Sequence, residues 1–250
     1  MKRILLYIYI IVVNFQISAN AEPNLMEKAN QLYEKKDYQS ASILYEQQNK
    51  QGECVALYYN LGNCYYRQQK FGLAILNYER ALRLDPGDAD ARHNLDVARA
   101  HTIDQITEPD ENVIFHWVGS VRDFYGSNVW AILSIVFFMG ILFGGFVYWY
   151  FAIVRYRKIG FGVGLCSFLL FVVCLSFSSS QKKRQFSNDS AVICASSVTV
   201  KNSPDSTACN IFVLHEGTEV KISDKINDFY EIELSNGSKG WLSTDAVKVI

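Results

Sequence analysis

The sequence lacks the short motifs that carry enzymatic chemistry. It contains no Gly-x-Ser-x-Gly nucleophile elbow, no phosphate-binding loop and no His-Glu-x-x-His zinc motif. Its four histidines do not stand at the spacing of metal ligands, and its six cysteines form no Cys-x-x-Cys pair. We therefore expect a protein that is not an enzyme and needs no metal or cofactor.

Three of the six cysteines lie in apolar surroundings, where cysteine acts as a small apolar side chain. Cys64 lies close to Gly62 in a helical pattern, and Cys166 and Cys174 lie in a long apolar run. Cys194 and Cys209 flank a predicted loop and are the pair that a disulfide could join in an oxidising compartment. Their spacing does not decide between that bridge and two free thiols.

The polar parts of the chain also lack an excess of positive charge. Residues 22–112 carry 10 Lys and Arg against 15 Asp and Glu, and residues 186–250 carry 5 against 9. Acidic segments argue against a nucleic-acid partner and against adhesion to anionic lipid.

Charge is absent altogether from two long runs. Neither 128–153 nor 159–180 contains a charged residue, and each reaches the ~20 residues that a bilayer core requires. The basic segment 154–158 separates them and is predicted to be a cytoplasmic loop, so we expect a transmembrane hairpin. Glycines in both runs favour close packing of the two helices.

The N-terminus has the three parts of a secretory signal peptide. Lys2 and Arg3 precede an apolar run over 4–13, and small residues then lead to Ala21. Cleavage there would place both soluble parts on the extracytoplasmic side, whereas an uncleaved anchor is the alternative. Residues 113–125 mix aromatic and charged side chains, which predicts a short helix in the membrane interface.

A helical repeat occupies the region after the signal peptide. The pattern Tyr58-x-x-Leu61-Gly62-x-x-Tyr65, followed by Ala74-x-x-x-Tyr78, Ala81 and Pro86, resembles the tetratricopeptide repeat. A weaker copy lies 33 residues upstream, and 90–100 matches only a first helix, as a capping helix would. This array is close to the minimum that buries a core, so it is either marginal alone or packs on another surface.

The resemblance implies a groove lined by the first helix of each hairpin. Asparagines there would bind the backbone of an extended peptide, and tyrosines would supply contact area. Packing between helices is the alternative role of Tyr59 and Tyr66. The predicted partner-binding residues are Asn30, Tyr33, Tyr59, Asn63, Tyr66, Arg67, His93 and Asn94.

From residue 191 onward short apolar runs have period two, which predicts β-strands. Asn236-Gly237 is a strong hairpin signal. The segments Glu216-Gly217-Thr218 and Gly240-Trp241-Leu242 resemble bacterial SH3-like domains, which implies a small β-barrel. We interpret Trp241 as a core residue rather than a ligand platform.

The fold class expected is therefore multi-domain: an α-solenoid of helical hairpins, a two-helix transmembrane hairpin and a C-terminal all-β SH3-like barrel. The predicted organisation is a signal peptide over 1–21, tetratricopeptide repeats over 22–101, a linker and interfacial segment over 102–127, spans over 128–153 and 159–180 around the loop 154–158, a linker over 181–190 and the barrel over 191–250.

This order of parts is similar to that of the BatE proteins of the Bacteroides aerotolerance system, with the repeat and its continuation over 90–95 the most similar stretches. The resemblance implies a bacterial inner-membrane protein with periplasmic domains. It implies as partners von Willebrand factor A-type membrane proteins and a MoxR-type ATPase, and a role in oxidative or envelope stress tolerance. The leading hypothesis is a scaffold; the alternative is a cell-wall sensor whose SH3-like domain binds peptidoglycan.

Overall fold

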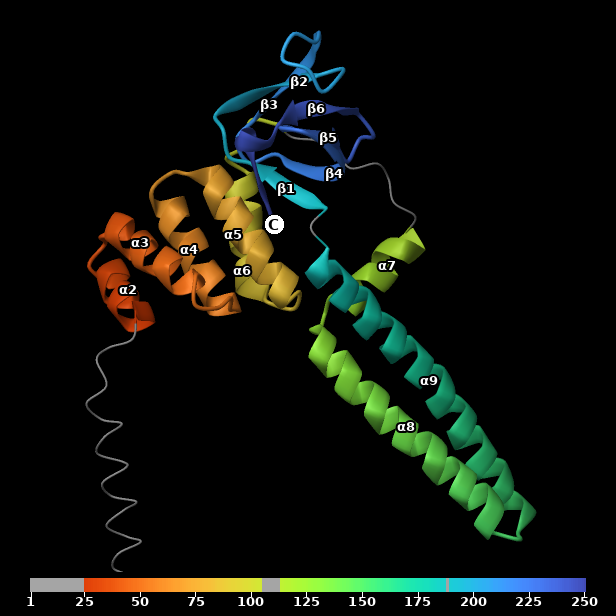
Figure 1. The fold of residues 1–250 in the computed structure, drawn as a ribbon. Helices are drawn as coiled ribbons and strands as arrows, with labels where there is room; N and C mark the ends of the chain where they lie inside the picture. The colour runs from red at the N-terminus through yellow and green to blue at the C-terminus, as the bar shows by residue number, and fades with distance from the viewer. Residues whose placement is uncertain (1–24, 105–112, 188) are drawn as a thin grey trace, which may run out of the picture.

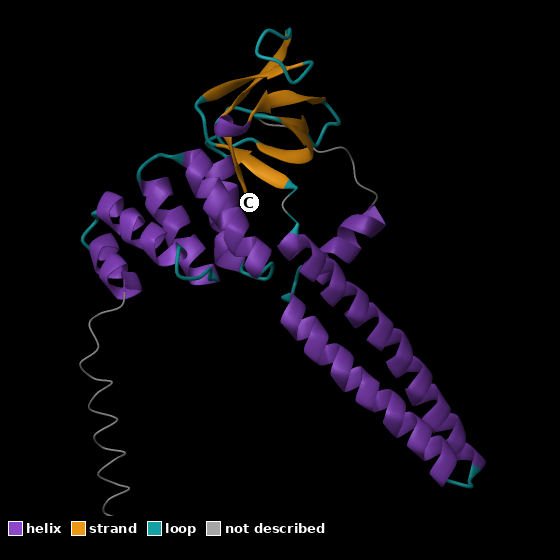
Figure 2. Cartoon of the chain, viewed as in Figure 1, coloured by secondary structure: helices purple, strands orange, loops and turns teal. Residues whose placement is uncertain are grey.

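The computed structural model describes residues 25–104, 113–187 and 189–250, and it consists of three parts (Figure 1). Five helices form the N-terminal part, two long helices form a hairpin that extends away from it, and a sheet covers one end of the helical part (Figure 2). The predicted signal peptide lies outside the described residues.

The N-terminal helices pack as successive antiparallel hairpins. Asp37 and Asp88 cap two of them, since their side chains accept backbone N–H groups of the first turn. The helices form two hairpins and one unpaired last helix, and their assignment as two repeats and a capping helix stays a prediction. The helices are α2 (Leu25–Glu34), α3 (Tyr38–Asn49), α4 (Val55–Arg67), α5 (Phe71–Leu84) and α6 (Ala89–Arg99).

Residues one repeat apart occupy equivalent places in the helical core. Ala41 and Ala74 are completely buried where helices approach, and Tyr45 and Tyr78 are 1% exposed. Gly62 is required by close packing, because an added Cβ would lie 2.5 Å from the ring of Tyr78. The small and aromatic positions predicted from the repeat pattern are therefore confirmed.

The two long helices are α8 (Ser127–Tyr150) and α9 (Val154–Phe186), and both are long and apolar enough to cross a membrane. They meet through glycines: a Cβ on Gly144 would lie 2.7 Å from the carbonyl oxygen of Gly160. The turn between them is at 151–153 rather than at the predicted loop 154–158. The basic residues of that segment belong to the start of α9 instead. At its other end, α9 continues to Phe186, into the predicted linker. Both differences arise because helical hydrogen bonding can continue beyond the end of an apolar run.

A shorter helix, α7 (Val113–Arg122), precedes the hairpin and agrees with the helix predicted there. Its exposed apolar side chains include Val113, Ile114 and Trp117. The loop that follows it packs under the repeats, since a Cβ on Gly87 would lie 2.9 Å from the carbonyl oxygen of Phe124. The helical repeats therefore rest directly on the near end of the hairpin.

The C-terminal part is an all-antiparallel sheet of seven strands in the order β3-β2-β6-β5-β4-β1-β7. The predicted hairpin at Asn236-Gly237 is confirmed: it joins β5 to β6, with Gly237 at φ +84°. The strands are β1 (Ser190–Ile193), β2 (Ser197–Lys201), β3 (Asn210–His215), β4 (Glu219–Ile226), β5 (Phe229–Glu233), β6 (Lys239–Ser243) and β7 (Val247–Val249), with a 3-10 turn, η1 (Thr244–Ala246), before β7.

The sheet does not close into the expected barrel. Among the described strands no pairing joins the edge strands β3 and β7, so the hydrogen-bonded order is open. One edge pair is formed by β7 and β1, and alternate side chains of β1 pack against two different cores. Ala191 and Ile193 belong to the core of the sheet, whereas Val192 belongs to the core of the helices.

The sheet packs on α5. It therefore provides the additional packing surface that a repeat array this short was expected to need. The backbone N–H of Gly72 donates to Glu216 Oε1 over 2.8 Å, and Arg80 donates to the carbonyl of Val249 over 2.5 Å. Asp104, just after α6, accepts from the backbone N–H of His215 over 2.6 Å. Helices and sheet thus form one packed unit.

Candidate functional site

The inner face of α4 carries four of the eight side chains of the predicted groove. Tyr59, Asn63, Tyr66 and Arg67 stand at i, i+4, i+7 and i+8, which places them on one side of the helix. The opposite side is buried in the core. The spacing that defines the repeat therefore also aims these residues into a common space.

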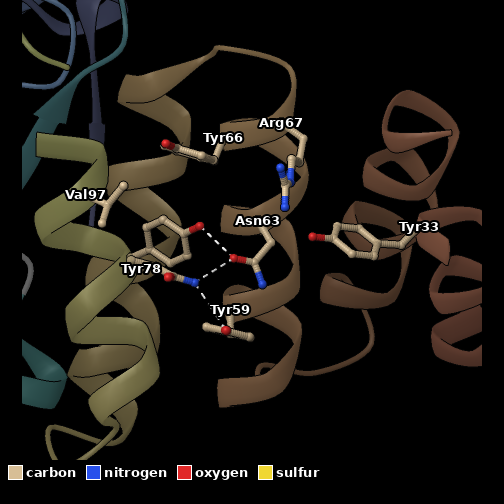
Figure 3. A pocket seen from close by; sticks show the side chains of 8 residues that line it. Tyr33, Tyr59, Asn63, Tyr66, Arg67, Tyr78 and Val97 are labelled. Atoms are coloured by element: carbon tan, nitrogen blue, oxygen red, sulfur yellow. Dashed lines mark hydrogen bonds between the residues drawn. The ribbon is translucent and has the colours of Figure 1, made fainter. Parts of the chain in front are cut away.

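A pocket of about 240 Å³ lies on this face between α2, α4, α5 and α6 (Figure 3). Six of the eight predicted groove residues line it, whereas Asn30 and His93 do not. Tyr78 and Val97 were not predicted for the groove; the hydroxyl of Tyr78 reaches it from a core position. The lining residues are Tyr33, Tyr59, Asn63, Tyr66, Arg67, Tyr78, Asn94 and Val97.

Asn63 organises the centre of the pocket. Its Oδ1 accepts from the hydroxyl of Tyr78 over 2.7 Å and from Nδ2 of Asn94 over 3.0 Å. Asn94 Nδ2 also donates to the hydroxyl of Tyr59 over 3.2 Å. The acceptor side of the Asn63 amide is used internally, which leaves its nitrogen to donate to a ligand.

The same arrangement occurs one repeat earlier. Asn30 Oδ1 accepts from the hydroxyl of Tyr45 over 2.5 Å and from Asn60 Nδ2 over 3.3 Å. Since Asn30 is equivalent to Asn63, and Tyr45 to Tyr78, the repeat conserves a contact between its two helices. Asn30 is exposed and does not line the pocket, so its predicted role in partner binding stays a prediction.

The residues that line the pocket carry one permanent charge, that of Arg67. The guanidinium of Arg67 is exposed and always protonated, and its hydrogen bond to the neighbouring Tyr33 raises its pKa further. Burial raises the pKa of Tyr78, so its phenol stays neutral. The hydroxyl of Tyr66 lies 3.3 Å from His101 Nε2, and the ring of His101 stacks on Phe71.

The lining groups are tyrosine rings and hydroxyls, two amides, one guanidinium and a valine. None of the eight lining residues is an acid, a histidine, a cysteine or a serine. Across the described part of the chain no group of His, Cys, Asp and Glu could hold a metal ion. The volume is smaller than the ~300 Å³ at which small-molecule pockets begin, so it suits one or two side chains of an extended segment.

The two cysteines considered for a disulfide are both free thiols in the structure. Cys194 packs against the helical core, and burial raises the pKa of its thiol, whereas Cys209 is exposed next to β3. The bridge therefore stays a prediction, for which the oxidation state of the purified protein is the test.

Helical hairpins with a polar concave pocket are typical of protein-interaction modules. In agreement with this class, the family model for the tetratricopeptide repeat matches residues 55–88. This match covers α4, α5 and the turn after them. No curated protein matches the chain.

Proposed function

We propose that this chain is a membrane-anchored scaffold that binds an extended segment of a partner protein in the pocket of the repeats. The observation that carries the proposal is the pocket itself: Asn63 and Arg67 present donors between tyrosine faces, as backbone carbonyls and apolar side chains of a peptide require. The hairpin α8–α9 is the proposed anchor.

The packing of the sheet on the repeats supports a membrane topology in which both lie on the same side. Because α5 and β1 share a core, the segments before and after the hairpin must lie on the same side of a membrane that it crosses. With the signal peptide expected from the sequence, that side is the periplasm. The resemblance to BatE proteins suggests von Willebrand factor A-type membrane proteins and a MoxR-type system as partners in stress tolerance.

The C-terminal sheet is proposed to be a divergent, open form of the SH3-like fold. Its docking on α5 favours a role in supporting the repeats. A peptidoglycan-binding role remains the alternative function, and retention of the full chain on purified sacculi is its test.

The partner is identified by crosslinking from the groove. A photoreactive residue at Tyr66 should capture a membrane protein, whereas the same residue at exposed Ile43 on α3 should not. Arg67→Glu should abolish capture, while Lys50→Glu, a charge reversal outside the pocket, should leave it unchanged. Equal capture from both positions, or an indifferent Arg67→Glu variant, would refute the groove.

A further inference from the structure

The hydrogen bonds inside the pocket of the repeats occupy acceptors and leave donors. Oδ1 of Asn63 accepts from the hydroxyl of Tyr78 and from Nδ2 of Asn94, so its own Nδ2 remains for a ligand. The hydroxyl oxygen of Tyr59 accepts from Asn94, and a phenol that accepts a hydrogen bond still has its own proton to donate. The amide oxygen of Asn94 is the acceptor that these bonds leave unused.

Arg67 adds the strongest donor. Its guanidinium carries five N–H groups in a planar fork, and the hydroxyl oxygen of Tyr33 accepts from it. The groups that raise its pKa are the phenols of Tyr33, Tyr38 and Tyr66, and none of them is a carboxylate. Arg67, Asn63 and Tyr33 point toward one another across the pocket (Figure 3). Donors from two helices therefore converge on one space.

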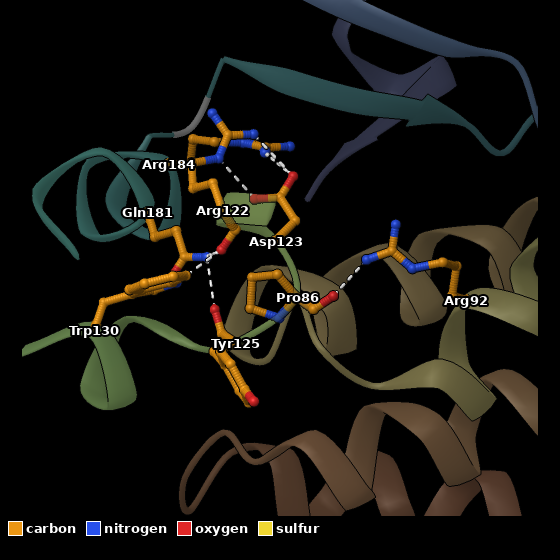
Figure 4. Close-up of polar contacts among 8 residues, drawn as sticks. All are labelled: Pro86, Arg92, Arg122, Asp123, Tyr125, Trp130, Gln181 and Arg184. Atoms are coloured by element: carbon orange, nitrogen blue, oxygen red, sulfur yellow. Dashed lines mark hydrogen bonds and ion pairs between the residues drawn. The ribbon is translucent and has the colours of Figure 1, made fainter. Parts of the chain in front are cut away.

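Arginines at the near end of the hairpin show what is missing at Arg67. Arg122 Nε lies 2.7 Å from Asp123 Oδ1, and Arg184 Nη1 lies 3.3 Å from Asp123 Oδ2 (Figure 4). Among the residues that the structure describes, no carboxylate lines the pocket or forms an ion pair with Arg67. Its charge is therefore not balanced by a neighbouring acid.

The groove face of α6 carries one acid, at the other end of the pocket. Asp90 lies one turn before Asn94, which contacts Tyr59 and Asn63, and Asp90 does not line the pocket. Tyr59 and Arg67 lie about 12 Å apart along the axis of α4, at 1.5 Å per residue. This exceeds the Debye length of about 8 Å at physiological ionic strength, so Asp90 does not neutralise Arg67.

We propose that the partner segment places one carboxylate side chain, an Asp or a Glu, in this pocket and that Arg67 binds it. An ionised carboxylate accepts hydrogen bonds and donates none, and its two oxygens match the fork of a guanidinium. One negative charge balances the one positive charge of the lining. The inference rests on the proposed function and adds the chemistry that the partner must have.

The acid is placed inside the segment rather than at a free chain end. Tyr59 and Tyr66 lie on α4 before and after Asn63, so contact area exists on both sides of the donors. A segment that ended at the donors would leave one of these tyrosines uncovered. The unused oxygen of Asn94 is available to a backbone N–H group of the segment.

The test uses the full chain in detergent and two pools of random heptapeptides with capped ends, which differ only in having Glu or Gln at the central position. Peptides retained by the immobilised protein are measured by mass spectrometry. We expect the Glu pool to be retained about tenfold better, the value of one hydrogen bond to a charged group. Arg67→Gln should remove this preference, whereas Lys50→Gln, outside the pocket, should keep it.

Charge reversal gives a readout that a structural role of Arg67 would not move. Arg67→Glu should retain a third pool, with Lys at the central position, better than the Glu pool. Loss of the fold would instead lower the retention of all pools together. An unchanged preference for the Glu pool in Arg67→Gln or in Arg67→Glu would overturn the proposal.

Two further outcomes separate this inference from the proposed function. Equal retention of the Glu and Gln pools, above that of a matrix without protein, would overturn the inference and leave peptide binding by the groove in place. No retention of any pool would contradict both. A pool whose peptides end in a free carboxylate tests the position of the acid, since its preference over the Glu pool would move the carboxylate to a chain end.

Discussion

Asn63 shows how single residues of this repeat serve both stability and recognition. Its Oδ1 holds Tyr78 and Asn94 in place, while its Nδ2 remains for a ligand. Replacing it with alanine would leave the two donors without their acceptor, at a cost of about 1–3 kcal/mol. Arg67, which is exposed, is therefore the cleaner residue with which to test binding.

Gly62→Ala should destabilise the helical part although alanine favours helix by about 0.5–1 kcal/mol. The added Cβ would lie 2.5 Å from Tyr78, whose ring is buried and cannot move away, and overpacking costs about 1–3 kcal/mol. We expect a lower Tm of the full chain in detergent. Gly52→Ala is the matched control, because nothing lies within 4 Å of its added Cβ; equal Tm values for the two variants would contradict the prediction.

At the scale of elements, α8 and α9 approach so closely that backbone contacts backbone. Gly144 lies against Gly160 and Gly164, whereas Gly145, one residue further, faces open space. In a bilayer, where apolar side chains gain little from leaving lipid, such close packing is a main source of helix association.

Gly144→Ala should loosen the hairpin, because its Cβ would meet backbone atoms of α9 at 2.7 Å that cannot shift cheaply. Gly145→Ala should leave it unchanged. Thermal melting followed by the fluorescence of Trp130 measures the difference, with the other three tryptophans replaced by phenylalanine in both variants. The same melting temperature for both variants would show that α8 and α9 do not pack in this way.

The sequence predicted the elements better than their contacts. The repeat pattern located α2–α6 and six residues of the pocket, because spacing within a helix decides which face a side chain occupies. It assigned Tyr78 only to the core, since the reach of its hydroxyl depends on Asn63 across the hairpin. The period-two pattern from residue 191 onward predicted strands, but not that Val192 of β1 would face the helices.

At the scale of the whole molecule, the contacts that join the parts link residues far apart in sequence. Glu216 meets Gly72, and Glu219 meets Arg99, across the inserted hairpin. No local pattern encodes such pairs, so the sequence could not indicate how the sheet docks. These contacts also place a partly buried acid, Glu79, at the junction.

Glu79 should make stability depend on pH. Burial, together with the nearby Glu219, raises its pKa from 4.5 to about 7, against the opposing effect of Arg99. Because the folded state binds the proton of Glu79 more tightly than the unfolded state, protonation of Glu79 stabilises the fold. This contribution to the free energy of unfolding is fully present below about pH 4.5 and is lost as pH rises through 7. Glu79→Gln should therefore raise Tm at pH 8 and change it little at pH 5.

Thermal melts of the full chain at both pH values measure this effect. Glu34→Gln, which removes an exposed acid at the end of α2, is the control and should leave the pH dependence as it is in the unmodified chain. An unchanged dependence in Glu79→Gln would mean that Glu79 is not buried at the junction.

The docking of β1 on α5 has a consequence for how the protein is made. Val192 is 117 residues beyond Ile75 in the chain, and the hairpin lies between them. At about 5–20 residues per second, a ribosome needs roughly 6–23 s to extend from one to the other. During that interval the face of α5 that later packs against β1 is exposed. We therefore expect chaperones to retain nascent chains that are truncated before β1.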